Sequence, residues 1–121
     1  MEFIEAPAFT RRLGDYLNDD SYKELQSRLG AYPELGDLMP GTGGFRKVRW
    51  ADRQRGKGRR GGLRIIYYYF KCDSLIWLMT LYDKDEASDL TTKQKKTLKV
   101  ALETELQARA IRRRSSLGRL R

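Results

Sequence analysis

The 121-residue sequence contains no histidine and only one cysteine. Without histidine it lacks the commonest general base, the commonest metal ligand and every Ser-His or Cys-His arrangement used in nucleophilic catalysis. The single thiol, Cys72, has no partner for an intrachain disulfide, so we expect a reduced structural cysteine. The chemistry of this chain must therefore come from its other polar residues.

Long apolar runs are also missing. No stretch approaches the roughly 18 residues that a membrane-spanning helix requires. The opening segment, MEFIEAPAF, carries acidic residues where a secretory signal has basic ones. These features predict a cytoplasmic protein that does not enter a membrane.

Two familiar kinds of ligand site are not found in the sequence. There is no Walker-type phosphate loop, and the GTGG at 41–44 precedes an expected strand rather than a helix, so we interpret it as a turn. The acidic residues of the 83–89 segment lack the spacing of an EF-hand loop. We expect neither a metal ion nor an organic cofactor.

What the sequence has in excess is positive charge. It contains 25 Lys and Arg against 16 Asp and Glu, a formal net charge of +9. Nine basic residues and one acid lie in residues 46–64, and six arginines without an acid lie in residues 109–121, which leaves −5 on the rest. Two concentrated basic segments on an otherwise acidic chain indicate a surface for a polyanion. A solvated surface of mixed charge is the alternative.

The spacing of apolar residues predicts three helices. Pro7 suits the first turn of a helix of about ten residues. Ser21 and Glu24 have the spacing of a capping box for a second helix. Thr91 and Gln94 have the same spacing at the start of a third. The first two helices form an antiparallel pair in this interpretation.

Alternating and β-branched residues predict a sheet. Residues 33–44 hold four glycines and two prolines and are expected to be loop. The last expected strand is apolar on both faces, which is typical of a central strand, and residues 71–73 connect it to the preceding one as a hairpin. The expected strands are Phe3–Ile4, Phe45–Ala51, Leu63–Phe70 and Ser74–Tyr82.

These elements predict an α+β fold with two N-terminal helices, an antiparallel twisted β-sheet and a C-terminal helix. Residues 1–108 form a single domain in this interpretation. The third helix is expected to end near residue 110, and residues 109–121 to form a flexible basic tail. With few large apolar residues, this tail suits an RNA contact better than a membrane-surface helix.

The candidate site lies on the expected strands. Lys47 and Arg49 alternate with apolar residues, so both cations leave one face of the sheet while the apolar residues pack inward. Arg64 begins the next strand, and Lys84 follows the strand after that. If these strands are neighbours, the four cations meet in one patch.

A patch of this kind suits RNA. Cations bind the phosphates, and aromatic rings stack on unpaired bases. RNA carries its own nucleophile, the 2′-hydroxyl, so a lysine or tyrosine can remove its proton while arginines stabilise the transition state. Spacing alone does not distinguish this chemistry from phosphate binding without catalysis. We expect RNA to be bound by Arg46, Lys57, Arg59, Arg60 and Tyr82.

Four strings resemble, in their order and spacing, the RelE/HigB toxins of bacterial type II toxin–antitoxin modules, and among these the HigB-like branch. They are MEFIEAPAF, ELGDLMPGTGGFRKVRWA, GKGRRGGLRIIYYYF and the strand that ends in LYDKDEASDLT, and they extend from residue 1 to about residue 105. The resemblance implies a compact α+β domain with its active surface on the sheet. It also implies metal-independent cleavage of translated mRNA in the A site of the 30S ribosomal subunit.

By position, the resemblance implies catalytic roles for four cations. Lys47 and Arg49 match the pair that flanks the substrate phosphate. Arg64 matches an arginine that stabilises the transition state, and Lys84 lies where related toxins have a basic residue after the fourth strand.

One position departs from the family pattern. RelE carries a tyrosine near its C-terminus that stacks on the base and takes part in proton transfer, and Leu90 stands at that position here. The resemblance therefore leaves the general base unassigned. Tyr82 is our candidate for base stacking, and a lysine of the 57–60 segment is another candidate to replace the tyrosine.

The resemblance also implies partners. A cognate antitoxin, commonly with a helix-turn-helix DNA-binding domain, would cover the basic face or block entry to the ribosome. The pair would repress its own promoter, so DNA is contacted only through the antitoxin.

Two other functions compete with the ribonuclease. A ParE-type toxin shares the fold but inhibits DNA gyrase without cutting RNA, and the presence of Lys47, Arg49 and Arg64 together argues against it. A non-catalytic nucleic-acid-binding protein is favoured by the missing tyrosine.

Overall fold

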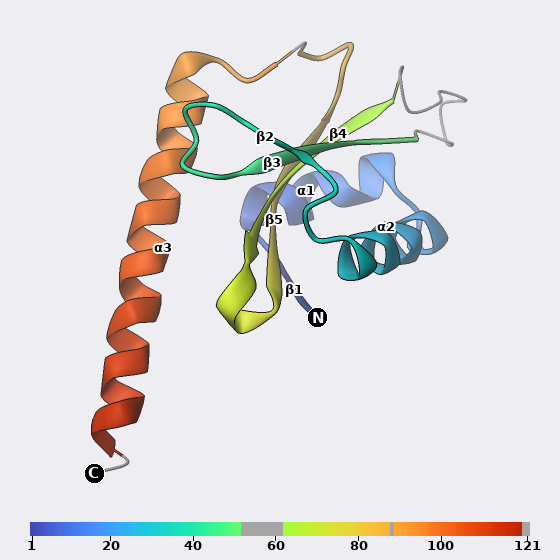
Figure 1. Cartoon of the computed structure of the whole chain (residues 1–121). Helices are drawn as coiled ribbons and strands as arrows, with labels where there is room; N and C mark the ends of the chain where they lie inside the picture. The colour runs from blue at the N-terminus through green and yellow to red at the C-terminus, as the bar shows by residue number, and fades with distance from the viewer. Residues whose placement is uncertain (52–61, 88, 120–121) are drawn as a thin grey trace. The chain divides into compact units, whose positions relative to one another are not determined.

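The computed structural model describes residues 1–51, 62–87 and 89–119, with side chains as far as residue 115. Over these residues it has the expected α+β architecture, with three α-helices and one five-stranded sheet (Figure 1). The chain divides into two compact units. The first consists of residues 1–39 and 45–89, and the second of residues 40–44 and 90–121.

The sheet belongs to the first unit and has the strand order β1-β5-β4-β3-β2. Strands β2 to β5 pair antiparallel, as expected, but β1 pairs parallel with β5, so the sheet is mixed. A parallel neighbour needs a long crossover, and here α1, α2 and three strands lie between β1 and β5 in the chain. The strands are β1 Glu2–Glu5, β2 Asp37–Leu38, β3 Arg46–Trp50, β4 Leu63–Phe70 and β5 Leu75–Asp83. β5 lies between β1 and β4, so the expectation that it is an inner strand is confirmed, while β4 is the middle strand.

Two helices, α1 (Pro7–Tyr16) and α2 (Asp19–Ala31), pack on one face of this sheet (Figure 1). Their buried side chains form the core with alternate residues of the strands. From the helices the core takes Phe9, Tyr16, Leu25 and Leu29, from the link between them Leu17, and from the strands Val48, Trp50, Leu63, Ile65, Tyr67, Ile76, Leu78 and Leu81. The other sheet face therefore displays the remaining residues of each strand.

The start of α2 differs from the expected capping box. Asn18 is the N-cap, and its side-chain oxygen accepts a hydrogen bond of 2.8 Å from the N–H of Ser21. Asparagine caps a helix as well as serine does, and this start places Asp19 and Asp20 in the first turn, near the positive end of the helix dipole. The prediction that Ser21 caps the helix with Glu24 is therefore wrong.

Part of the expected loop at 33–44 is the short strand β2. Asp37 pairs with Lys47, and Leu38 pairs with Arg46. Two residues are too few to show a period in the sequence. Gly36 permits the close approach, because a Cβ there would lie 3.0 Å from the backbone of Lys47.

The hairpin between β4 and β5 is confirmed. It turns through a short 3₁₀ segment, Lys71–Asp73, and closes at Ser74, which has a left-handed φ of 46°. Cys72 lies exposed in this turn. The expected structural role of its thiol is therefore wrong, because a turn residue outside the sheet does not reach the core.

The second unit contains α3 (Thr92–Arg119). Its predicted capping box is confirmed: the N–H of Thr91 donates to Gln94 Oε1 at 2.8 Å, and the N–H of Gln94 donates to Thr91 Oγ1 at 3.1 Å. The helix does not end near residue 110 as expected but continues through residue 119. No proline interrupts it, and Glu105 forms ion pairs with Arg109 and Arg112 near the expected end of the helix.

Within the described residues we find no helix with both the length and the hydropathy needed to cross a bilayer.

Candidate functional site

Strand pairing places three polar side chains side by side across the sheet. Arg49 of β3 is directly opposite Arg64 of β4, and Arg64 is directly opposite Tyr82 of β5. Directly opposed residues of antiparallel strands point to the same face. We call Arg49, Arg64 and Tyr82 the polar row. It lies on the face away from α1 and α2, because the neighbouring residues in sequence belong to the core.

Lys47 shares this face, two residues before Arg49 on β3. Its Nζ lies 3.6 Å from a carboxylate oxygen of Asp89, in an ion pair at the surface. The structure therefore brings together three of the four expected catalytic cations, Lys47, Arg49 and Arg64. It adds a carboxylate that we did not expect.

Arg64 is a buried cation. Its Nη1 donates to the backbone carbonyls of Gly62 at 3.3 Å and Leu63 at 3.5 Å. In the described part of the chain no carboxylate forms an ion pair with it. A buried guanidinium held by two neutral carbonyls keeps its full positive charge and has further N–H groups for an anion.

Tyr82 is buried, with 6% of its surface exposed. Its hydroxyl has no hydrogen-bond partner among the described residues. Burial raises the pKa of Tyr82, the charge of Asp89 raises this pKa further, and Arg64 lowers it. The phenol is therefore protonated at neutral pH and can donate a hydrogen bond. As it lies, the ring has no open face on which a base could stack.

The remaining predicted residues lie elsewhere. Lys84 is exposed in the turn after β5, where its N–H donates to the carbonyl of Gly62 at 3.4 Å. Arg46 extends from the opposite side of β3 to Lys47 and donates to the carbonyls of Glu34 at 3.2 Å and Gly36 at 2.8 Å. Arg46 therefore holds a loop and lies apart from the polar row. The other expected RNA-binding residues, Lys57, Arg59 and Arg60, lie outside the described residues.

The turn after β5 is fixed by a chain of contacts. Asp83 accepts the N–H of Asp85 at 2.8 Å, and the N–H of Asp83 donates to Glu86 Oε1 at 3.2 Å. Glu86 also forms an ion pair with Arg12 of α1. These contacts hold residues 83–86 of the turn that follows Tyr82.

Asp89 is the residue that sequence analysis missed. In the sequence, the acids of the 83–89 segment lack the spacing of a metal-binding loop, and no local pattern distinguishes Asp89 from the others. An acid that follows a strand of a basic sheet is a weak signal for a proton acceptor. Its pairing with Lys47, a residue 42 positions earlier, appears only in the folded chain.

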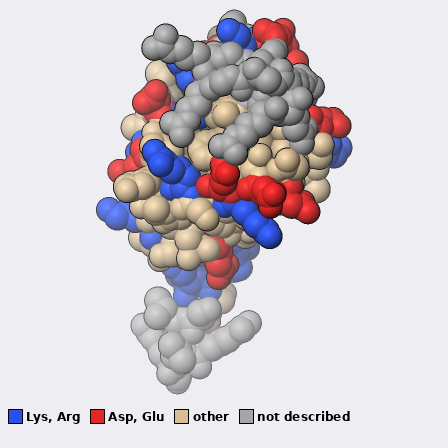
Figure 2. Space-filling model, turned by 90° about the vertical axis from the view of Figure 1, so that its right-hand side faces the viewer, with Lys and Arg blue, Asp and Glu red and all other residues tan. Residues whose placement is uncertain are grey.

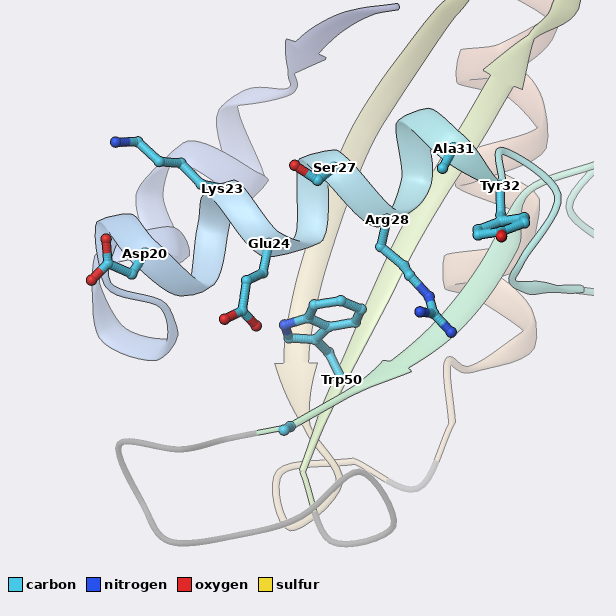
Figure 3. Close-up of a pocket in the computed structure, with 9 residues that line it drawn as sticks. Asp20, Lys23, Glu24, Ser27, Arg28, Ala31, Tyr32 and Trp50 are labelled. Carbon is cyan, nitrogen blue, oxygen red and sulfur yellow. The ribbon is translucent and has the colours of Figure 1, made fainter.

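A separate hollow lies on the helical side of the first unit, with a volume of about 590 Å³ (Figure 3). Side chains from the outer face of α2 and the end of β3 line it, among them Glu24, Arg28, Tyr32 and Trp50. The lining mixes the acids Asp20 and Glu24 with the bases Lys23 and Arg28, so the hollow lacks the single charge sign that a polyanion requires. Acidic and basic side chains are also mixed on the side of the molecule that Figure 2 shows.

The polar row and Lys47 provide adjacent cations that suit a phosphate. Tyr82 adds a protonated phenol, and Asp89 adds a carboxylate beside Lys47.

No protein-family model matches the chain.

Proposed function

We propose that this protein is a ribosome-dependent endoribonuclease of the toxin type, which cleaves translated mRNA and is neutralised by a cognate antitoxin. The supporting observation is the direct pairing of Arg49 with Arg64 and of Arg64 with Tyr82 on one sheet face. Two opposed arginines suit the bidentate binding of a phosphate.

The two arginines have different tasks in this proposal. Arg49 is exposed and binds the incoming phosphate. Arg64 is buried, so its charge acts in a medium of lower dielectric constant and is worth more to the developing negative charge. Arg64 is therefore the principal stabiliser of the transition state.

Asp89 completes the reaction as the general base. Its carboxylate takes the proton of the 2′-hydroxyl, whose oxygen then attacks the phosphorus. The bond from phosphorus to the 5′-oxygen breaks and leaves a 2′,3′-cyclic phosphate. In this proposal Lys84, in the exposed turn two residues after Tyr82 and outside the polar row, supplies the proton that the departing 5′-oxygen takes.

Non-catalytic RNA binding is the second candidate. It is favoured by the ion pair between Lys47 and Asp89, because a carboxylate held by a lysine is a weaker proton acceptor. The same cations would then hold RNA without cutting it.

One experiment separates these functions. The chain is expressed from a tightly controlled promoter, and mRNA 5′ ends are mapped during growth arrest. Arg64→Ala is compared with Arg11→Ala, which removes an exposed arginine from α1. Codon-phased cleavage that is lost only in Arg64→Ala supports the ribonuclease. Growth arrest with intact transcripts contradicts it and favours gyrase inhibition, and the absence of arrest at equal protein levels favours RNA binding alone.

A further inference from the structure

The loop between α2 and β2 is held rigidly by two side chains of the sheet. The Tyr67 hydroxyl donates to the carbonyl of Pro33 at 2.8 Å and accepts the N–H of Gly36 at 2.9 Å. Arg46 donates to the carbonyls of Glu34 and Gly36. Because Tyr67 is buried, these bonds are shielded from water, and the loop backbone has little freedom.

This rigid loop presents apolar side chains to solvent. Tyr32 is 59% exposed and Leu35 is 38% exposed. The guanidinium carbon of Arg28 lies 5.6 Å from the centre of the Tyr32 ring, and both side chains are drawn in Figure 3. Tyr32 and Leu35 line a groove of about 590 Å³, which we call the Tyr32 groove. Its other lining residues are Ala31, Pro33, Glu34, Tyr69 and Lys71.

We infer that the Tyr32 groove docks an acidic segment of another protein. An apolar side chain of that segment packs against Tyr32, Leu35 and Tyr69, and its carboxylates pair with Arg28 and Lys71. Exposed aromatic and aliphatic residues on a rigid backbone are typical of interface hot spots, because little conformational entropy is lost when they bind.

The charge of the rim selects the partner. Lys71 lines the groove and Arg28 lies beside it against the Tyr32 ring, while the carboxylate of Glu34 already lies 4.0 Å from Arg46. Two cations, Lys71 and Arg28, therefore face an incoming chain. A second copy of this protein would bring the same basic rim and an overall charge of +9, so self-association is disfavoured.

The Tyr32 groove and the polar row lie on opposite faces of the sheet. Tyr69 packs against the core with Ile65 and Tyr67, whereas Arg64 alternates with these residues along β4. A partner in the groove therefore leaves the polar row uncovered. This inference does not depend on the proposed ribonuclease activity.

The test selects binding peptides with the full chain. The immobilised protein is used to select peptides from a random display library, and the most enriched peptide is synthesised and titrated by fluorescence anisotropy. We expect Leu or aromatic residues beside Asp or Glu in the selected peptides. Tyr32→Asp and Leu35→Asp should each weaken binding by about tenfold or more, and Lys71→Glu should weaken it by several-fold.

Three controls make the result decisive. Tyr32→Phe keeps the ring and should keep the affinity. Ile111→Asp changes an exposed apolar residue of α3, and Arg64→Ala changes the polar row; both should bind the peptide unchanged. Circular dichroism and thermal melting establish that each variant is folded.

Four outcomes overturn the inference. They are a library that yields no enriched peptide, enriched peptides that are basic, equal affinity for the wild type and Tyr32→Asp, and a dimer in sedimentation that Leu35→Asp dissociates. Measured beside these, mRNA cleavage should be retained in Tyr32→Asp and lost in Arg64→Ala, so the failure of one proposal is distinguishable from the failure of the other.

Discussion

Arg49 and Arg64 are directly opposed residues on the antiparallel strands β3 and β4, so two positive charges leave adjacent positions on one face of the sheet. Like charges at opposed positions destabilise a strand pair. The opposed arginines therefore cost stability, and this cost is understandable if both cations bind the same anion. The pair therefore has measurable consequences for both stability and binding.

Removal of one charge should stabilise the fold. We expect Arg49→Gln to raise the free energy of unfolding by about 0.5 kcal/mol at low ionic strength. The gain should largely disappear at about 1 M salt, where charges are screened over about 3 Å. Urea unfolding at two salt concentrations measures this, with Arg11→Gln on α1 as the control. A variant less stable than the wild type at low salt would contradict the repulsion.

Loss of an arginine from this pair should weaken RNA binding, although it should stabilise the fold. Each phosphate neutralised on single-stranded RNA contributes about 0.7 to the slope of log affinity against log salt. Arg64→Ala should therefore weaken RNA binding and reduce that slope by about 0.7. Arg46→Ala should leave the slope unchanged, because Arg46 holds the loop carbonyls of Glu34 and Gly36. A slope reduced equally in both variants would show that Arg46 also contacts phosphate.

The sequence predicted the part of the site that local geometry determines. Alternation along a strand places Lys47 and Arg49 on one face, and it equally places Arg46 on the other. The expected RNA contact of Arg46 would therefore lie on the opposite face of the sheet from Lys47 and Arg49. Charge alone suggests an RNA contact for Arg46, and charge carries no information on direction.

Non-local contacts could not be predicted in this way. The pairing of Lys47 with Asp89 and that of Arg12 with Glu86 each join residues more than 40 positions apart in the sequence. The parallel pairing of β1 with β5 likewise joins distant segments. Neither contact leaves a periodic signal in the sequence.

Two buried tyrosines should respond differently to loss of the hydroxyl. Tyr67→Phe removes two hydrogen bonds that hold the loop at 33–36 and should destabilise the protein by about 1–3 kcal/mol. Tyr82→Phe removes a buried hydroxyl with no partner among the described residues, so the change should be near zero or slightly stabilising. Denaturant unfolding of both variants measures the difference. Equal destabilisation would mean that the Tyr82 hydroxyl has a partner.

The same tyrosines predict a loss of stability in alkali. Burial raises the pKa of Tyr67 and of Tyr82 above the value of about 10 that a phenol has in the unfolded chain. Their contribution is therefore fully present below about pH 10 and is lost as the pH rises toward the folded-state pKa, because the unfolded state loses its protons first. Thermal melting from neutral to alkaline pH should show this decline, and it should be shallower in Tyr82→Phe. Tyr32→Phe at the surface is the matched control.

The role of Asp89 can be tested against a neighbouring acid. If its carboxylate takes the 2′-proton, Asp89→Asn should lower the cleavage rate by about 10² to 10⁴, the usual contribution of a general base. The affinity for RNA should rise, because a negative charge leaves the cationic face. Stability should change little, since surface ion pairs contribute about 0–1 kcal/mol.

Asp37→Asn provides the control, because Asp37 is the residue directly opposite Lys47 on β2 and its loss changes the local charge equally. Single-turnover cleavage on programmed ribosomes separates the two effects. A rate that falls in Asp89→Asn alone identifies a proton acceptor. Equal cleavage rates in both variants would mean that Asp89 is not the general base and that catalysis depends on the cations alone. The ion pair of Asp89 with Lys47 would then have only a structural role.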